Sequence, residues 1–232
     1  MDKNTTQQFQ TLLLDLDDTL LDFGAAERTA IAKTFRDIGL EPTEALLSRY
    51  SEINISQWEA FERGEISRDT VLTRRFELLF AELGLSHDPQ SVEDRYRGYL
   101  AIGHYFVDGA VELLEYLAPK YDLYLASNGV AETQNSRLAS AGIGKYFKEI
   151  FISETTGHHK PEKAYFDFCF ARIPNFDPEK ALIVGDSLTS DILGGKNAGI
   201  RTCWLNPTGK PCRPDISPDF EIRSLRELKA LL

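Results

Sequence analysis

Hydrophobic and polar positions follow two different patterns along this chain. In residues 10–16 the apolar residues Leu12, Leu13 and Leu14 follow one another without alternation, which is typical of a buried central strand in a parallel sheet. From residue 22 to about residue 104, apolar residues instead recur at helical spacing, three and four positions apart. Glycine and proline breaks divide this stretch into four predicted helices, at 25–38, 43–62, 67–83 and 92–103. The first strand is therefore followed by an all-helical block.

Beyond the helical block, strand and helix patterns alternate to the end of the chain. The predicted strands lie at 121–126, 149–153, 181–184 and 202–205, with a short one near Phe220. The predicted helices lie at 108–118, 131–141, 162–172, 188–198 and 225–232. This alternation predicts an α/β fold with a Rossmann-like parallel sheet and helices on both faces. We expect a core domain of residues 1–21 and 106–232, with residues 22–105 inserted as a helical cap domain.

Composition and charge narrow the class of protein. The 232 residues are 42% hydrophobic and 27% charged, as expected for a globular protein. The 36 acidic residues exceed the 26 basic ones, and the net charge of −10 argues against nucleic acid or an anionic membrane as the main partner. A polar start and the lack of a long apolar window predict a cytoplasmic location. Three widely spaced cysteines fit reduced thiols better than a disulfide or zinc framework.

The first predicted strand ends in two carboxylates, Asp15 and Asp17, which are separated by one residue. Side chains alternate across a strand, so both carboxylates leave the same side of the backbone. Like charges at this distance raise each other's pKa unless a cation, a shared proton or a division of roles compensates. One member of such a pair can be a nucleophile and the other an acid/base. The alternative is an ordinary acidic turn after a buried strand.

The other strand ends carry polar residues of complementary chemistry. Ligands of a parallel sheet bind beyond the carboxyl ends of its strands, so residues at these ends are candidates for a site. The second strand of the core ends in Ser127, Asn128 and Gly129, and a loop after the third contains Lys160. The fourth ends in Gly185, Asp186 and Ser187, and Asp191 follows one turn into the next helix.

These residue types suit phosphoryl transfer. Asp15, Asp17 and Asp186 offer the hard oxygen ligands that Mg²⁺ prefers. Lys160 offers a point charge to phosphate oxygens, while Ser127 and the backbone N–H groups that follow it offer hydrogen bonds. We therefore expect Asp15, Asp17 and Lys160 to be catalytic, and Ser127, Asn128, Gly129 and Lys160 to bind substrate.

With these motifs in this order, the sequence resembles the haloacid dehalogenase superfamily of phosphotransferases. The motifs stand here as Asp15-Leu16-Asp17-Asp18-Thr19, Ser127, Lys160 and residues 185–191, and the inserted block resembles the family's smaller helical cap type. The resemblance implies that Asp15 attacks phosphorus and becomes an aspartyl-phosphate. It implies that Asp17 protonates the leaving oxygen and later activates water. It also implies Mg²⁺ held by the Asp15 carboxylate, the Asp17 carbonyl and Asp186, with Asp191 nearby.

Asp17 helps to separate the reaction classes of this superfamily. The dehalogenases that gave it its name usually lack an aspartate at this position, whereas a phosphate ester leaving group needs a proton. We therefore expect a Mg²⁺-dependent phosphomonoester hydrolase. The alternatives are a phosphatase of phosphoglycolate or another small phosphoester, a sugar phosphomutase and, less favoured, a 2-haloacid dehalogenase. A non-enzymatic phospho-receiver domain is disfavoured because its compact fold has no room for the helical insertion.

A finer likeness concerns the substrate. Asp22-Phe23, Ser127-Asn128-Gly129 and residues 202–206 resemble the bacterial 5′-nucleotidases that act on pyrimidine and noncanonical nucleoside monophosphates. A nucleobase needs a flat apolar surface with polar groups beside it, and Trp58 with Asn54, four residues apart on a predicted helix, offers both. Packing within the helical block is the alternative for both residues. We expect a small-molecule phosphoester, a nucleoside monophosphate, as the partner, and a monomer or weak homodimer.

One further segment, residues 194–199, superficially resembles a phosphate-binding loop. The GxxxxGK[ST] frame fails because Ser190 stands in place of its first glycine and Asn197 in place of its hydroxyl residue. We interpret the segment as a helix end with a glycine cap.

Overall fold

The computed structural model describes residues 8–232, which form two compact units. Of the described residues, the core unit comprises 8–22, Phe106–Ala131 and Ala141–Leu232. The helical unit comprises Phe23–Tyr105 together with Glu132–Ser140. The contacts thus group a segment that follows the second strand with the helical unit, which the sequence pattern did not indicate. The proposed division into folding domains, 1–21 and 106–232 against 22–105, stays a prediction.

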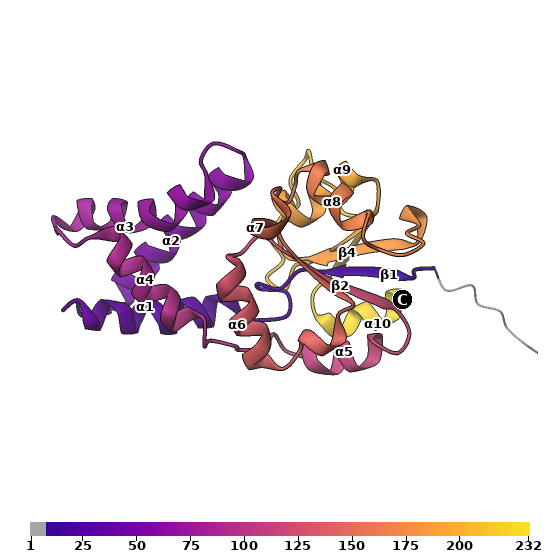
Figure 1. The fold of residues 1–232 in the computed structure, drawn as a ribbon, viewed down its shortest axis with the longest axis horizontal. Coiled ribbons are helices and arrows are strands. Elements are labelled where there is room, and N and C mark those ends of the chain that lie inside the picture. Colours follow the sequence, from indigo (N-terminus) through magenta and orange to yellow (C-terminus); the bar gives the residue numbers. More distant parts are fainter. Residues whose placement is uncertain (1–7) are drawn as a thin grey trace, which may run out of the picture. The chain divides into compact units, whose positions relative to one another are not determined.

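The core unit is built on a six-stranded parallel sheet in the order β3-β2-β1-β4-β5-β6 (Figure 1). Its strands are β1 (Thr11–Leu14), β2 (Asp122–Ser127), β3 (Glu149–Ile152), β4 (Ala181–Gly185), β5 (Arg201–Leu205) and β6 (Phe220–Ile222). All four residues of β1 and all five of β4 are buried, as their continuous apolar runs require for central strands. The predicted α/β fold with a Rossmann-like sheet is confirmed.

Helices cover both faces of this sheet. Figure 1 shows α8 (Lys163–Phe170) and α9 (Leu193–Ala198) on one face, and α5 (Ala110–Leu117) and α10 (Leu228–Leu231) on the other. Three side chains of α8, those of Tyr165, Phe166 and Cys169, pack in one buried cluster with side chains of β1, β2 and β4. The sheet is therefore a rigid base, and its strand ends are fixed relative to one another.

Two local differences from the predicted elements have physical causes. The predicted helix at 188–198 is divided into a π-helical turn (Leu188–Ile192) and α9, and the Ser187 hydroxyl caps the turn by accepting the Ser190 N–H at 3.1 Å. A short helix, α7 (Ser153–Thr156), follows β3 and was not predicted. Its two threonines donate side-chain hydrogen bonds to main-chain carbonyls, a local contact that gives no apolar periodicity.

The helical unit contains four long helices and one that comes later in the chain. They are α1 (Phe23–Asp37), α2 (Glu44–Glu62), α3 (Arg68–Leu83), α4 (Pro89–Leu100) and α6 (Ala131–Ala141). Thr43, Ser67 and Asp88 cap the N-termini of α2, α3 and α4 with side-chain oxygens. The helix predicted to begin at residue 92 begins at Pro89, because proline is favoured at the first helical position after the Asp88 cap. An apolar cluster contributed by α1 to α4 forms the interior.

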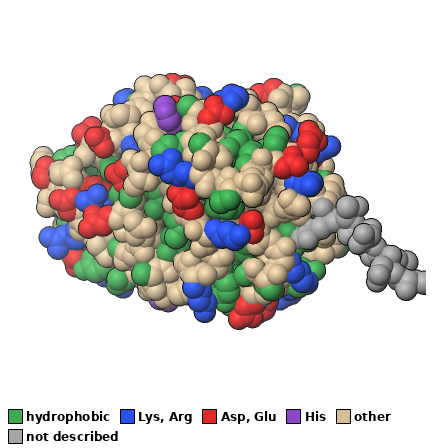
Figure 2. Space-filling model, turned by 45° about the vertical axis from the view of Figure 1, so that its right-hand side comes forward, with side chains coloured by type: hydrophobic (Ala, Val, Ile, Leu, Met, Phe, Trp, Pro, Cys, Tyr) green, Lys and Arg blue, Asp and Glu red, His purple; other side chains and the backbone are tan. Residues whose placement is uncertain are grey.

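Three further observations concern the surface, the helices and the cysteines. Figure 2 shows Lys and Arg side chains interspersed with Asp and Glu on the displayed face, so the charge there is mixed. Within residues 8–232, no helix is both long and apolar enough to cross a membrane. The three cysteines are free; Cys169 and Cys203 are buried and Cys212 is exposed.

Candidate active site

Three strand ends of the core unit bring the predicted motifs together. Strands β2, β1 and β4 are neighbours and run parallel, so their carboxyl ends lie at the same edge of the sheet. Asp15 follows β1, Ser127 is the last residue of β2, and Asp186 follows β4. The Asp15 N–H donates to the Val184 carbonyl at 3.0 Å, which extends the β1–β4 ladder as far as the first carboxylate. The sheet itself positions Asp15.

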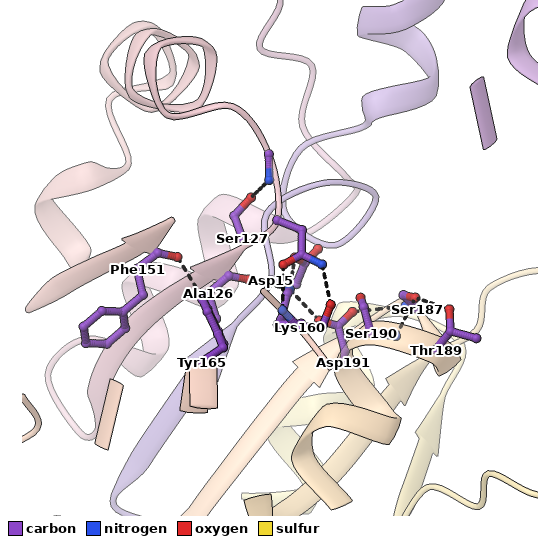
Figure 3. Close-up of polar contacts among 12 residues, drawn as sticks. Asp15, Ala126, Ser127, Phe151, Lys160, Tyr165, Ser187, Thr189, Ser190 and Asp191 are labelled. Atoms are coloured by element: carbon purple, nitrogen blue, oxygen red, sulfur yellow. Dashed lines mark hydrogen bonds and ion pairs between the residues drawn. The ribbon is translucent and has the colours of Figure 1, made fainter. Parts of the chain in front are cut away.

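Lys160 lies at the centre of the site (Figure 3). Its ammonium donates to Asp15 Oδ1 at 2.7 Å, to Asp191 Oδ1 at 2.6 Å and to the Ala126 carbonyl at 2.6 Å. A lysine ammonium has three N–H donors, so all of them are used. The side chain is 1% exposed, and the two carboxylates outweigh the effect of burial and raise its pKa, which keeps the lysine charged.

Asp191 reaches this position because of the turn that follows β4. Its Oδ2 accepts the Ser187 N–H at 3.1 Å, and its side chain lies directly over Gly185. A Cβ on Gly185 would lie only 2.1 Å from Asp191 Oδ2, so only glycine fits at this strand end. Gly185 belongs to a predicted motif but had no predicted role. The signal was its place immediately before Asp186, where the backbone has to allow a close approach.

Three carboxylates converge on one small volume. Oxygens of Asp15, Asp186 and Asp191 all lie within 4.8 Å of one another, and Lys160 is the cation in contact with two of them. Burial, reinforced by Asp191 and Asp17, raises the pKa of Asp15 to about 8 against the opposing effect of Lys160. Burial, together with Asp15 and Asp191, also raises the pKa of Asp186 well above its ordinary value. Without a further cation, these carboxyl groups therefore hold protons that they would ordinarily release, and their hard oxygens fit a divalent cation such as Mg²⁺.

Asp17 and Asp18 lie in the turn that follows β1. Asp17 forms an isolated bridge with Leu21, and the Asp18 N–H donates to the Leu21 carbonyl at 2.7 Å. Asp18 has a φ of 55°, in the left-handed region that aspartate tolerates better than most residues. Among the described residues, the cluster of carboxylates is made of Asp15, Asp186 and Asp191 and does not include the Asp17 side chain. The predicted metal ligand at Asp17 is its main-chain carbonyl, so that role stays a prediction.

The end of β2 places the predicted substrate-binding residues beside Lys160. Ser127 is 1% exposed, and its hydroxyl accepts the Gly129 N–H at 3.2 Å. The Asn128 amide contacts the main chain of Lys160, donating to its carbonyl at 2.8 Å and accepting its N–H at 2.9 Å. Both of these contacts of Asn128 are therefore within the protein, and its predicted contact with substrate stays a prediction. The contacts of Ser127 and Gly129 with a substrate stay predictions.

The two residues predicted to contact a nucleobase lie in the helical unit, and their environments differ. Asn54 is 1% exposed; its amide donates to Glu27 Oε1 at 2.6 Å, and its oxygen accepts from Arg75 at 2.8 Å. Both ends of this amide bind side chains of other helices, and the predicted contact of Asn54 with substrate stays a prediction. Trp58 is partly exposed and packs edge-on against Phe61, with ring centroids 5.7 Å apart. Its role as a base platform stays a prediction.

Comparison with known proteins gives the same family. Residues 9–199 match the haloacid dehalogenase-like hydrolase family. The chain is 46% identical over 226 residues to YfnB of Bacillus subtilis (strain 168), which is named as a HAD-hydrolase, and the match covers 97% of this chain and 96% of that protein. A crystal structure of YfnB, described as bound to magnesium and as revealing interdomain movement, has a TM-score of 0.93 and 47% identity, over 97% of this chain and 99% of that one.

Two further relatives are named for an activity. Pyrimidine 5′-nucleotidase PynA of Streptococcus pneumoniae (strain ATCC BAA-255 / R6) is 38% identical, over 95% of this chain and 93% of that protein. Pyrimidine 5′-nucleotidase YjjG of Escherichia coli (strain K12) is 32% identical, over 95% of this chain and 96% of that protein. These matches span nearly the full length of both partners, and they agree with the lysine-centred group of carboxylates at the strand ends. The chain belongs to the haloacid dehalogenase-like hydrolases.

Proposed function

We propose that this protein is a Mg²⁺-dependent phosphomonoester hydrolase that acts on nucleoside 5′-monophosphates through an aspartyl-phosphate. The observation that carries the proposal is Asp15 bound to a buried lysine, with Asp186 and Asp191 converging on the same volume. A buried carboxylate beside a fixed ammonium suits a nucleophile that has to meet an anionic phosphate.

The carboxylates would hold Mg²⁺, with Asp15 and Asp186 as ligands and Asp191 beside them. The raised pKa values of Asp15 and Asp186, and the oxygen donors of all three carboxylates, fit a hard divalent cation. When bound, Mg²⁺ supplies positive charge that keeps Asp15 ionised and neutralises phosphate oxygens. In agreement with this proposal, the YfnB structure is described as bound to magnesium.

The reaction proceeds in two displacements. A carboxylate oxygen of Asp15 forms a bond to phosphorus while the bond from phosphorus to the ester oxygen breaks, and Asp17 gives its proton to the leaving alkoxide. Water then attacks the phosphorus and passes a proton to Asp17, and the bond between Asp15 and phosphorus breaks to release phosphate. Lys160, whose ammonium already contacts Asp15, stabilises the negative charge that accumulates on the phosphoryl oxygens. Ser127 and the N–H groups after it orient the phosphate.

The substrate class rests on the named relatives and on one side chain. PynA and YjjG, both named as pyrimidine 5′-nucleotidases, match nearly all of this chain. Trp58 is the partly exposed aromatic side chain that we assign to the base. Asp17 supports hydrolysis of a phosphoester over dehalogenation, because an alkoxide leaving group needs a proton and a halide does not. We also place the protein in the cytoplasm, on the cysteine usage of its sequence.

The test is phosphate release from a panel of nucleoside monophosphates, sugar phosphates and phosphoglycolate, measured with Mg²⁺ and with EDTA. We expect turnover concentrated on nucleotides and abolished by EDTA. Asp15→Asn should lower kcat more than about 100-fold because the nucleophile is lost. Asp215→Asn, which alters an exposed carboxylate paired with Arg213, is the matched control and should leave kcat unchanged. Near-normal turnover by Asp15→Asn would contradict the assignment of the nucleophile.

A further inference from the structure

Asn128 binds the main chain of the lysine at the centre of the site. Its Nδ2 donates to the Lys160 carbonyl at 2.8 Å, while its Oδ1 accepts the Lys160 N–H at 2.9 Å. The two bonds occupy the oxygen and the nitrogen of the planar amide together. We propose that Asn128 is a positioning residue that fixes Lys160 for the reaction.

The same strand end holds both ends of Lys160. The Ala126 carbonyl accepts from the ammonium at 2.6 Å, and Asn128, two residues later, holds the lysine main chain. The residue between them, Ser127, turns its hydroxyl to the Gly129 N–H instead. Residues 126 and 128 therefore both contact Lys160, whereas the hydroxyl of Ser127 contacts the Gly129 N–H.

The loop is held from its other side by α9. Asn197 Nδ2 donates to the Pro161 carbonyl at 3.1 Å, so consecutive carbonyls, of Lys160 and Pro161, each accept from an asparagine side chain. A Cβ on Gly194 would lie 2.6 Å from the Phe166 ring and 3.2 Å from Pro161 Cα. The glycine therefore lets α9 lie directly against these residues. These contacts give Gly194 and Asn197 a structural role, and Gly199 caps the end of α9, so the likeness of residues 194–199 to a phosphate loop is superficial.

The two hydrogen bonds from Asn128 to the Lys160 main chain matter because the lysine side chain is held in one position in the site. All three donors of its ammonium are engaged, two of them with the carboxylates Asp15 and Asp191. A shift of about 1 Å in a group that positions reactants can cost about 100-fold in rate. This inference rests on the proposed function, since it assigns Asn128 a role through Lys160 in that reaction.

The first test is kinetic, with Asn128→Ala and the isosteric Asn128→Asp. A positioning role predicts that kcat falls about 10- to 100-fold for p-nitrophenyl phosphate and for a nucleoside monophosphate. KM should change by less than about threefold, because substrate contacts remain. Asn135→Ala removes an exposed amide from α6 and is the control, with kcat unchanged. A higher KM with unchanged kcat would make Asn128 a substrate ligand and overturn the proposal.

The second test measures the bond itself, without substrate or metal. Hydrogen exchange at the Lys160 amide, followed by mass spectrometry of peptides covering residues 158–163, should be faster in Asn128→Ala, which lacks the acceptor. Asn128→Asp keeps an acceptor and loses the donor, so protection should persist while kcat still falls. Unchanged exchange in Asn128→Ala would show that Asn128 does not hold the Lys160 main chain and would overturn the proposal. If the wild-type protein hydrolyses no phosphoester, the proposed function fails, yet this exchange experiment still decides whether Asn128 holds Lys160.

Discussion

The two units bury charged side chains in opposite ways. In the core unit, oxygens of three carboxylates converge within 4.8 Å around one lysine. In the helical unit, polar side chains form a chain of bonds to which each of α1 to α4 contributes. Its members are Ser51, Glu27, Asn54, Arg75 and Glu93, joined in that order.

This difference in how charges are paired distinguishes a candidate active site in the core unit from a structural network in the helical unit. In the helical network, neighbouring members are a donor and an acceptor, and Arg75 also stacks over the Tyr96 ring, with its guanidinium carbon 4.8 Å from the centroid. Such a network connects the helices, and the pairing of its members does not require a bound ligand. In the core unit, like charges are held close against their repulsion. That arrangement costs stability in the absence of a cation and is typical of active sites.

The largest effect on stability should come from breaking the helical network. Arg75→Met leaves Glu93, which is 0% exposed, without its cation. A buried charge that loses its partner lowers the free energy of unfolding by about 3–5 kcal/mol. Urea denaturation followed by circular dichroism measures this change. The kcat of the protein that remains folded should be within about twofold of wild type, because the network contacts no reacting group.

The matched control is the double variant Arg75→Met with Glu93→Leu, which replaces the ion pair by apolar side chains. Most of the lost stability should return, because removing both charges avoids the unpaired carboxylate. A single variant as stable as wild type, or a double variant no better than the single one, would show that the network does not hold the helices together.

A smaller effect is expected from pH on the metal-free protein. Between the ordinary aspartate value of 3.8 and the folded value of about 8, Asp15 keeps a proton in the folded state that the unfolded chain has released. By linkage, the free energy of unfolding therefore falls as pH rises through this window, and Asp186, whose pKa is also raised, acts in the same direction. Thermal unfolding in EDTA should give a lower Tm at the upper end of the window.

Adding Mg²⁺ and substituting Asp15 test the same pH dependence in two further ways. Bound Mg²⁺ favours the ionised carboxylates, so it should raise Tm more at the upper end of the window than at the lower end. Asp15→Asn removes one of the titrating groups and should flatten the pH dependence in EDTA. A metal-free Tm that rises across the window would contradict the account of the carboxylate site.

The features that the sequence predicted correctly are local. Continuous apolar runs predict buried parallel strands, and residues that end neighbouring strands must meet, so Asp15, Ser127 and Asp186 could be brought together from the sequence. The helical periodicity of residues 22–104 likewise depends only on spacing. These patterns repeat over many residues, so tertiary contacts rarely override them.

The features that the sequence did not predict are contacts between residues that are far apart in the sequence. Asn54 was a reasonable ligand by chemistry, but Glu27 and Arg75, 27 and 21 residues away, take up its amide. Asn128 is bound by Lys160, 32 residues away, and nothing in the spacing of the two residues shows it. Asp191, on the π-helical turn, lies so close to Gly185 that no side chain fits there, and the spacing of the two residues does not show this contact. Which polar side chains meet is decided by packing, and periodicity does not encode it.

The most direct test of the central claim is a calorimetric titration of Mg²⁺ into the wild-type protein near neutral pH, in buffers of different ionisation enthalpy. We expect binding with release of protons, because the carboxylates with raised pKa must ionise to hold the cation. Asp186→Asn should weaken binding at least about 10-fold. Glu93→Gln, in the helical network, should leave it unchanged. Equal affinity in wild type and Asp186→Asn, or binding without proton release, would contradict the claim that the converging carboxylates form a metal-dependent active site.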